Sequence, residues 1–384
     1  MNKTYQYRLY PTKKQRITLN KWLALCCEVY NAALQERRDA YRMAGQSLSY
    51  SHQCAELPGC KLVRTELAEV NSQVLQDAVK RVDRAFDGFF RRVQAGQQPG
   101  YPRFRSRLRY NSLTFKQYQN SFDVQKGKQR QGILILSKLG HIKMVMHRPL
   151  TGLPKTATVK RTPTGKWFVS ISVETEPEVD CLPPSDEQVG IDVGLKTFAY
   201  LSTGEQIANP RFFREEEQAL ARAHRKLSKE PKATKRREKR RKVVARVHER
   251  VRWRRENFNR QQVACLIKRF GLIAVEALVV RNLVKNPKLA KSIADAAWSS
   301  FFAQLLGKAE EAGRAVVRVN PAYTSQTCSA CGHRQEMPLS VRVYDCPSCG
   351  LVMDRDHNGS QNILAQALEA VGRHGCVIPE APGL

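Results

Sequence analysis

Four cysteines near the C-terminus constrain the fold more than any other feature of this sequence. They form two CxxC pairs separated by fourteen residues, Cys328, Cys331, Cys346 and Cys349. Each pair can turn two thiolates to one side, and two pairs complete the tetrahedral sulfur site that structural Zn²⁺ prefers. The spacing predicts a zinc ribbon over residues 321–353. A redox-active CxxC pair and an iron centre with the same ligands remain alternatives.

The net charge indicates a polyanionic partner. The chain has 65 Lys and Arg against 35 Asp and Glu, which gives +30, and each half, divided at residue 189, carries +15. A compact chain with this excess repels itself unless a polyanion neutralises it, and nucleic acid is the natural one. No apolar run is long enough for a membrane span, and the basic runs lack the apolar face of a membrane-surface helix. We therefore expect a cytoplasmic protein without a membrane partner.

At 384 residues the chain exceeds what one core usually organises. Residues 3–9 alternate as a short strand, and helical periodicity then dominates residues 13–97, with Thr12 and Gln15 as a capping box. From residue 98 to 180 the period changes to two. We predict a small antiparallel barrel or sandwich of five to seven strands from residues 1–12 and 98–180, which carries the helical part as an insertion. The acidic, Pro-containing residues 181–189 suit a linker.

The second half alternates strands and helices. Residues 190–205 predict a buried strand that turns back into a hairpin, and residues 211–269 predict a basic helical hairpin interrupted at Pro231. Two short apolar strands and a final helix beginning near Asn358 follow. The expected fold class is therefore α/β plus β, with an α/β domain over residues 190–320 and 354–384 that the ribbon interrupts.

Three acidic residues occupy positions where burial is normally unfavourable. Asp192 lies inside an apolar strand, Glu276 ends another, and Asp356 stands near the start of the last helix. Two Mg²⁺ ions about 4 Å apart would require such carboxylates, and would hydrolyse a phosphodiester. In a ribonuclease-H-like sheet, these three segments meet at one edge. Taken singly, Asp356 could be a helix cap, and Glu276 and Asp192 could be ion-paired residues.

Two basic segments are candidates for nucleic-acid contact. The first interleaves cations and rings, in the order Tyr101, Arg103, Phe104, Arg105 and Arg107, with Tyr110 nearby. Such a mixture suits phosphate contact and base stacking. The second, residues 211–260, carries +13, and its candidates are Lys235, Arg236, Arg237, Arg240 and Arg241. The alternatives are a basic loop with core aromatic anchors and a solvated helix face.

Several motifs resemble one family. GIDVGLKTF at residues 190–198, VEALVVRNL at 275–283, both cysteine knuckles and DRDHNGSQNIL at 354–364 resemble the TnpB (OrfB) proteins of bacterial insertion sequences, compact relatives of type V CRISPR effectors. Supporting motifs in the first half are YRLYPT, VYNAAL, LQDAVKRVDRAF and GYPRFRSR. The resemblance covers almost the whole chain. One departure is that Gly359 and Ser360 replace the double alanine common in relatives.

The resemblance implies a RuvC-like nuclease domain with the catalytic residues Asp192, Glu276 and Asp356 binding Mg²⁺. It assigns the metal to Asp356 and a supporting role to Asp354, although the sequence alone leaves the reverse open. It also implies that residues 1–12 and 98–180 are a wedge domain and residues 13–97 a recognition lobe. The implied partners are a guide RNA from the transposon end and double-stranded target DNA beside a transposon-adjacent motif, in a nucleoid-associated bacterial protein.

The alternative is a nuclease-inactive nucleic-acid-binding regulator or transposition accessory protein. The intact Asp192, Glu276 and Asp356 favour the nuclease, because relatives that serve only in binding would be expected to lose them. The sequence leaves the oligomeric state, the guide sequence and the target-adjacent motif open.

Overall fold

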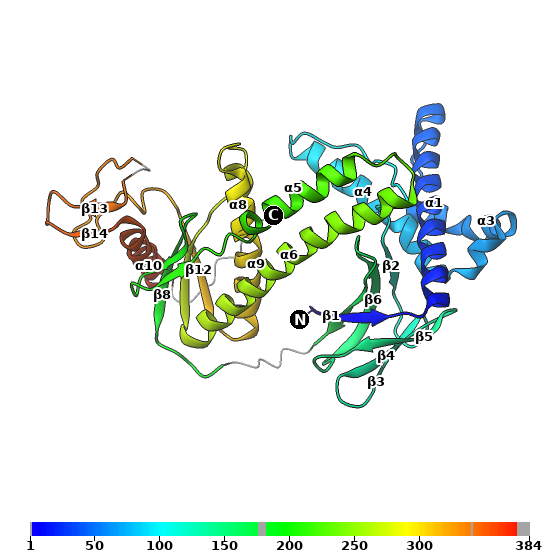
Figure 1. Ribbon diagram of the computed structural model, residues 1–384, viewed down its shortest axis with the longest axis horizontal. Coiled ribbons are helices and arrows are strands. Elements are labelled where there is room, and N and C mark those ends of the chain that lie inside the picture. Colours follow the sequence, from blue (N-terminus) through cyan, green and yellow to red (C-terminus); the bar gives the residue numbers. More distant parts are fainter. Residues whose placement is uncertain (1, 176–181, 339–340, 375–384) are drawn as a thin grey trace. The chain divides into compact units, whose positions relative to one another are not determined.

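The computed structural model describes residues 2–175, 182–338 and 341–374, and divides into two compact units, Met1–Glu178 and Val179–Leu384. Parts of three predicted segments lie outside the described residues. They are residues 176–180 of the expected barrel with residue 181 of the linker, residues 339–340 of the ribbon, and residues 375–384 at the C-terminal end. Figure 1 shows the elements, and each unit is described by itself below.

The first unit contains a seven-stranded antiparallel sheet, in the order β2-β6-β7-β1-β5-β4-β3. Its strands are β1 (Asn2–Tyr10), β2 (Ser112–Phe115), β3 (Phe122–Lys126), β4 (Gln131–Leu136), β5 (Gly140–Val145), β6 (Leu153–Arg161) and β7 (Trp167–Glu174). The first strand belongs to this sheet, as predicted, and the structure places it at the centre, with Tyr7 opposite Val169. No ladder joins β2 to β3 within the described residues, so the predicted strands are confirmed without a closed barrel.

Helices fill the interval between β1 and β2. They are α1 (Lys13–Ala44), α2 (Tyr50–Ala55), α3 (Leu57–Val63), a 3₁₀ turn (Thr65–Glu69) and α4 (Ser72–Gln94). The predicted capping box is confirmed, because Thr12 and Gln15 bond reciprocally at the start of α1. In the sequence, apolar residues follow helical spacing from Leu67 onward, which predicts a helix that begins there, but α4 begins only at Ser72. Asn71 accepts a hydrogen bond from the Gln73 N–H and so starts α4 later.

The helices are anchored to the sheet by a buried ion pair. Asp77 and Arg81 lie one turn apart on α4, with Nε and Oδ2 2.8 Å apart. Arg81 then donates through Nη1 to the carbonyl oxygen of Ser112 and through Nη2 to Thr114, both on β2. A pair that is hydrogen-bonded on both sides offsets much of its desolvation cost, so it fixes α4 against the sheet edge.

The second unit contains a mixed five-stranded sheet, in the order β10-β9-β8-β11-β12. Its strands are β8 (Gln188–Val193), β9 (Thr197–Leu201), β10 (Gln206–Ala208), β11 (Leu272–Glu276) and β12 (Ala315–Val319). The strands β8, β11 and β12 run parallel, whereas β9 and β10 return antiparallel. The hairpin after Gly190 and both later strands are confirmed.

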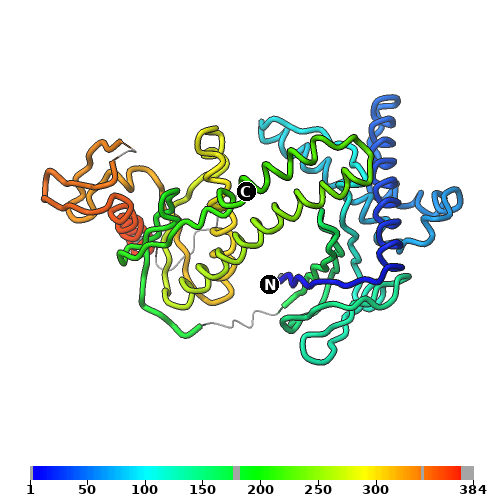
Figure 2. Tube along the Cα trace, in the orientation of Figure 1, coloured from blue at the N-terminus to red at the C-terminus, as the bar shows by residue number. Residues whose placement is uncertain are grey.

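Helices cover both faces of this sheet. The helices are α5 (Phe212–Ser228), α6 (Lys235–Arg269), α7 (Val280–Leu283), α8 (Ala290–Ala296), α9 (Trp298–Glu311) and α10 (Arg355–His374). Side chains of α6, α8 and α9 form one core with β8 and β11, and α10 forms a smaller core on the opposite face. Figure 2 follows the chain along α5 and back along α6, the predicted basic hairpin.

Between β12 and α10 the chain forms the cysteine-containing loops and a short antiparallel pair, β13 (Val343–Asp345) with β14 (Val352–Asp354). The last helix begins at Arg355, three residues before the predicted start near Asn358. Within the described part of the chain, no helix combines the length and the apolar character that crossing a membrane requires.

Candidate active site and metal centre

Two acidic residues meet at one edge of the five-stranded sheet. Asp192 lies near the end of β8, and Glu276 is the last residue of the neighbouring parallel strand β11. The register pairs Ile191 with Val275, so Asp192 and Glu276 occupy the next step of adjacent strands. Because Ile191 and Val275 face the core under α9, the alternation of a strand turns both carboxylates toward the face that α10 covers.

The third carboxylate arrives on α10. Asp356 lies in the first turn of that helix, and an ideal Cβ built on Gly194 would lie 3.8 Å from its Oδ2. On the same helix, a Cβ on Gly359 would lie 2.9 Å from Oδ2 of Asp192. The start of α10 therefore lies beside Asp192, and the small residues that the sequence has here leave space for the carboxylates.

Burial and like charge shape the electrostatics of this group. Burial, and then the charges of Glu276 and Asp356, raise the pKa of Asp192 well above its usual value. Burial also raises the pKa of Glu276, while a hydrogen bond from Thr324 acts in the opposite direction. The charges of Glu276 and Asp356 act on Asp192, so the structure brings these three carboxylates from distant segments into one neighbourhood.

Asp354 and Asp356 have different surroundings. The exposed Asp354 accepts a hydrogen bond from the Asp356 N–H at 2.8 Å, which is the contact of a helix cap. Asp356 instead lies 3.5 Å from Nη1 of Arg342 and 3.6 Å from Nη2 of Arg355. The cap considered for Asp356 is thus supplied by Asp354, and the Asp356 carboxylate is instead ion-paired with Arg342 and Arg355.

The ligand atoms of Asp192, Glu276 and Asp356 do not form a compact cluster of the kind seen at the four cysteines. Among the described residues, only the four cysteines and the surface group Glu36, His52 and Glu56 bring ligand atoms within 4.8 Å of one another in groups of three or more. The three carboxylates are not among these compact groups. Partly buried oxygen donors with excess negative charge are the chemistry that Mg²⁺ requires, so the donor set fits this metal.

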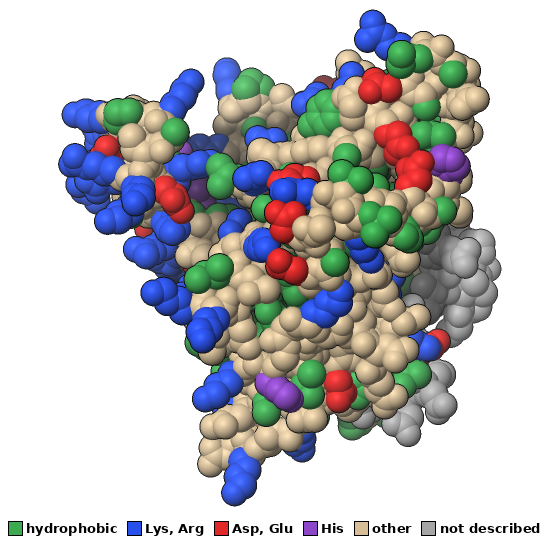
Figure 3. Space-filling model, turned by 90° about the vertical axis from the view of Figure 1, so that its right-hand side faces the viewer, with side chains coloured by type: hydrophobic (Ala, Val, Ile, Leu, Met, Phe, Trp, Pro, Cys, Tyr) green, Lys and Arg blue, Asp and Glu red, His purple; other side chains and the backbone are tan. Residues whose placement is uncertain are grey.

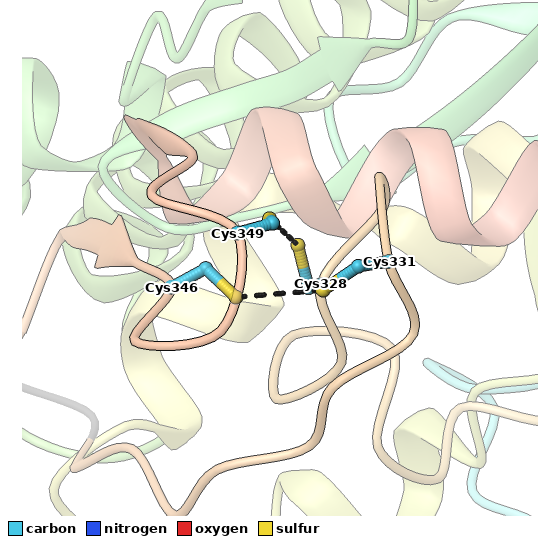
Figure 4. A group of neighbouring side chains, drawn as sticks. All are labelled: Cys328, Cys331, Cys346 and Cys349. Atoms are coloured by element: carbon cyan, nitrogen blue, oxygen red, sulfur yellow. Dashed lines mark hydrogen bonds between the residues drawn. The ribbon is translucent and has the colours of Figure 1, made fainter.

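The four cysteines come together as the spacing predicted, and Figure 4 shows their side chains converging. The sulfur atoms of Cys328 and Cys349 are 3.6 Å apart, as are those of Cys331 and Cys346. A tetrahedral site with Zn–S bonds of about 2.3 Å has sulfur atoms about 3.8 Å apart. The observed spacing is far too long for a disulfide and fits a Zn²⁺ ion.

Both knuckles have the same local structure. Each ends in a glycine with positive φ, Gly332 at 76° and Gly350 at 73°, whose N–H donates to the carbonyl of the first cysteine. Burial raises the pKa of Cys346, but bonds from the backbone N–H groups of Cys349 and Ser348, together with side-chain bonds to Cys331 and Cys349, outweigh it and lower the pKa to about 6. A thiol that ionises readily is a good metal ligand.

Two amides on α10 bind the segment that enters the ribbon, and the sequence analysis did not identify them. Asn358 donates to the Thr327 carbonyl at 2.7 Å and accepts from the Ser329 N–H at 2.9 Å. Asn362 donates to the carbonyls of Thr324 and Thr327. Their spacing of four residues on one helix face, in a helix otherwise expected to pack on the sheet, was the available signal.

In the first unit, an aromatic and cationic cluster is exposed. Tyr101 and Phe104 are about half exposed, and the guanidinium of Arg38 on α1 lies over both rings. The backbones of Arg103 and Arg105 are bonded to α1, while Arg103, Arg105 and Arg107 expose their side chains, and Arg107 pairs with Glu28. Tyr110 is a core residue at 1% exposure and cannot stack on a base.

The basic run on α6 divides into two kinds of residue. Arg237 donates to the carbonyls of Leu227 and Glu230 at the end of α5, so it closes the corner of the hairpin. Arg236 and Arg240 share the Glu230 carboxylate. Lys235 and Arg241 extend from exposed positions. The five predicted contact residues are therefore close together, but not equally available.

Three family models match the chain. They are described as "Helix-turn-helix domain" over residues 1–46, "Probable transposase" over 170–287 and "Cas12f1-like, TNB domain" over 298–363. A Streptomyces pristinaespiralis protein named "Putative RNA-guided DNA endonuclease" is 36% identical, with 96% of this chain and 90% of that protein covered. The Escherichia coli K12 protein with the same name and the suffix InsQ is 29% identical, covering 94% and 91%.

More distant likenesses extend to CRISPR proteins. A "CRISPR-associated endodeoxyribonuclease Cas12f1" from Sulfoacidibacillus thermotolerans is 23% identical over 80% of each chain. The solved structure of a Cas12f1–sgRNA–target DNA complex has a TM-score of 0.59 at 17% identity, with 92% of this chain and 83% of that chain covered, which shows a common fold. From the near full-length match at 36% identity, this chain belongs to the TnpB (OrfB) family of insertion-sequence proteins.

Proposed function

We propose that this protein is an RNA-guided, Mg²⁺-dependent DNA endonuclease with Asp192, Glu276 and Asp356 as its catalytic residues. Family membership and the names of its relatives support the activity. The observation that carries the site is the convergence of the three carboxylates, from β8, β11 and α10, with the raised pKa of Asp192. Such a group is unfavourable unless cations neutralise it.

In this proposal, the three carboxylates hold Mg²⁺ in a RuvC-like site. The ions supply an activated water and stabilise the leaving oxygen of the phosphodiester. The residues of the protein position the three carboxylates. The parallel register aligns Asp192 with Glu276, Asp354 caps α10, and Gly194 and Gly359 leave space around the carboxylates. The four cysteines hold structural Zn²⁺ beside this site.

The remaining parts of the chain are proposed to hold nucleic acid. Residues 1–12 and 98–180 act as the wedge domain and residues 13–97 as the recognition lobe, on a guide RNA from the transposon end and a double-stranded target. Lys and Arg side chains predominate over Asp and Glu along one margin of the face in Figure 3, as expected for a surface that follows phosphates. A chain of +30 that acts on DNA is expected at the bacterial nucleoid.

The test combines RNA identification with cleavage. RNA that copurifies with the protein is sequenced, and the complex is tested on plasmids that carry the matching target beside randomised flanks. Asp192→Ala, Glu276→Ala and Asp356→Ala should each abolish cleavage and retain RNA binding, because the carboxylates bind metal rather than phosphate. Asp354→Ala should cause a smaller loss.

Two outcomes contradict the proposal. Appreciable cleavage by any of the three alanine variants refutes the site assignment. Wild-type protein that binds guide RNA and target but leaves every plasmid intact, with Mg²⁺ present, supports the alternative of a nuclease-inactive binding protein.

A further inference from the structure

Glu276 has one close polar neighbour that does not belong to the acidic group. The Thr324 hydroxyl donates to Oε1 of Glu276 at 2.6 Å, and Thr324 is buried, with 4% exposure. The same hydroxyl lies 3.2 Å from the Pro321 carbonyl. A hydroxyl has one proton to donate, and the shorter contact to the charged acceptor is the stronger one. Thr324 is therefore a specific donor to this carboxylate.

Thr324 does not belong to the sheet that carries Glu276. It lies five residues after the end of β12 and four residues before Cys328, in the segment that leads into the zinc ribbon. Turn hydrogen bonds from the N–H groups of Gln326 and Thr327 to the Tyr323 carbonyl fix this segment locally. The donor that reaches Glu276 is therefore held by ribbon structure.

The Thr324 backbone is also held from α10. Its carbonyl accepts from Asn362 Nδ2 at 2.8 Å, and the same amide donates to the Thr327 carbonyl at 2.7 Å. Asn358 forms hydrogen bonds with the other end of the segment, at Thr327 and Ser329. Both asparagines are buried, so these bonds are shielded from competing water. The first knuckle, α10 and Thr324 thus form one connected network that ends on Glu276.

We propose that Thr324 is a positioning residue that orients the Glu276 carboxylate for divalent metal and links the zinc ribbon to the metal site. This inference rests on the proposed metal-binding role of Glu276. The hydrogen bond to Oε1 restricts rotation of the Glu276 carboxylate. The side chain then loses less conformational entropy when an ion binds, so the ion binds more tightly. Loss of a hydrogen-bond donor to a metal ligand commonly weakens metal affinity by about 10- to 100-fold.

The experiment compares Mn²⁺ binding by full-length protein in its purified guide-RNA complex, measured by electron paramagnetic resonance. The binding event that Glu276→Ala removes defines the site, because Mn²⁺ bound to RNA is common to all variants. Thr324→Val deletes the hydroxyl while it keeps the branched shape, and Thr324→Ser keeps the hydroxyl. Thr327→Val is the matched control, since its hydroxyl donates to the Tyr323 carbonyl in the same turn without touching a carboxylate.

We expect Thr324→Val to weaken this Mn²⁺ site by about 10-fold, with wild-type zinc content by elemental analysis, and Thr324→Ser and Thr327→Val to resemble wild type. Thr324→Ala, which adds no methyl group beside the carboxylate, must show the same loss if Thr324→Val folds poorly. Wild-type Mn²⁺ affinity in both hydroxyl-free variants overturns the positioning role alone. If Glu276→Ala removes no Mn²⁺ site, the proposed metal site and the role of Thr324 fail together.

Discussion

A close approach of α10 to the sheet offers a sharp test of how Asp356 is positioned. Gly190 on β8 lies directly under the helix, and a Cβ built on it would be 2.0 Å from the Ser360 carbonyl oxygen and 2.8 Å from the Leu364 nitrogen. Both are main-chain atoms, so no side-chain rotation relieves the overlap. In Gly190→Ala, α10 must therefore move away by at least 1 Å to reach 3.0 Å, the shortest distance that real Cβ contacts show, and by more to reach ordinary van der Waals contact at 3.4–4 Å.

This displacement should affect both stability and cleavage. Overpacking of a well-packed contact costs about 1–3 kcal/mol or more. In a unit of this size, that cost corresponds to a melting temperature lower by roughly 2–12 °C. Moving Asp356 by about 1 Å relative to Asp192 should slow the chemical step by about 100-fold. Thermal melting and single-turnover cleavage with saturating guide RNA and Mg²⁺ measure the two effects.

Gly372→Ala, which changes a glycine of α10 itself, provides the control. A Cβ at Gly372 meets nothing within 4 Å, so this substitution should stabilise the helix by about 0.5–1 kcal/mol and leave cleavage unchanged. If Gly190→Ala melts and cleaves like wild type, the tight contact between β8 and α10 does not position Asp356, and the reasoning is wrong.

Four further predictions concern charge and metal. Asp192→Asn should raise the melting temperature of Mg²⁺-free protein at pH 7.5. Because the pKa of Asp192 is raised in the native state, the wild type loses stability as pH rises from about 4 toward that pKa. The stability gained by Asp192→Asn should therefore disappear near pH 4. An unchanged or lower melting temperature of the variant at pH 7.5 contradicts this prediction. Cys346→Ser should remove zinc and destabilise the second unit by several kcal/mol, whereas a zinc-free wild type by elemental analysis would refute the ribbon. Replacing Arg103, Arg105 and Arg107 by Gln should lower the salt dependence of guide-RNA or DNA binding by about one phosphate contact each, and unchanged affinity at two salt concentrations would make them a structural loop. Gln at Lys235 and Arg241 should weaken binding at wild-type melting temperature, whereas Arg237→Gln should lower the melting temperature. The opposite pattern would refute the division of the α6 run.

The sequence predicted those parts of the fold that follow from local periodicity and spacing. Alternation identified β1 as a strand, and the capping box at Thr12 placed the start of α1. The cysteine spacing predicted a four-sulfur cluster because a CxxC knuckle is a local structure. The start of α4 was misjudged, since Leu67 and Val70 are buried like helix residues but precede the Asn71 cap.

Contacts between distant segments could not be predicted in the same way. The sequence offered Tyr110 as a base-stacking ring, but tertiary packing between Tyr30 and Arg81 places it in the core. Arg38 is 63 residues from Tyr101, and only the fold brings its guanidinium over that ring. Nothing in the sequence indicated a role for Thr324, because its hydrogen bond to Glu276 depends on where the segment before Cys328 docks.

The restraints on the acidic residues differ, and this difference separates the effects of zinc loss from those of Gly190→Ala. The parallel register alone aligns Asp192 with Glu276, whereas Asp356 depends on how α10 docks. The contact at Gly190 acts on α10 but not on Glu276. The hydrogen-bond network of the ribbon segment acts on both, because Asn358 and Asn362 join it to α10 and Thr324 joins it to Glu276. Zinc loss should therefore disturb two carboxylates and weaken Mn²⁺ binding more than Gly190→Ala does. Equal losses in the two variants would mean that the ribbon acts on α10 only.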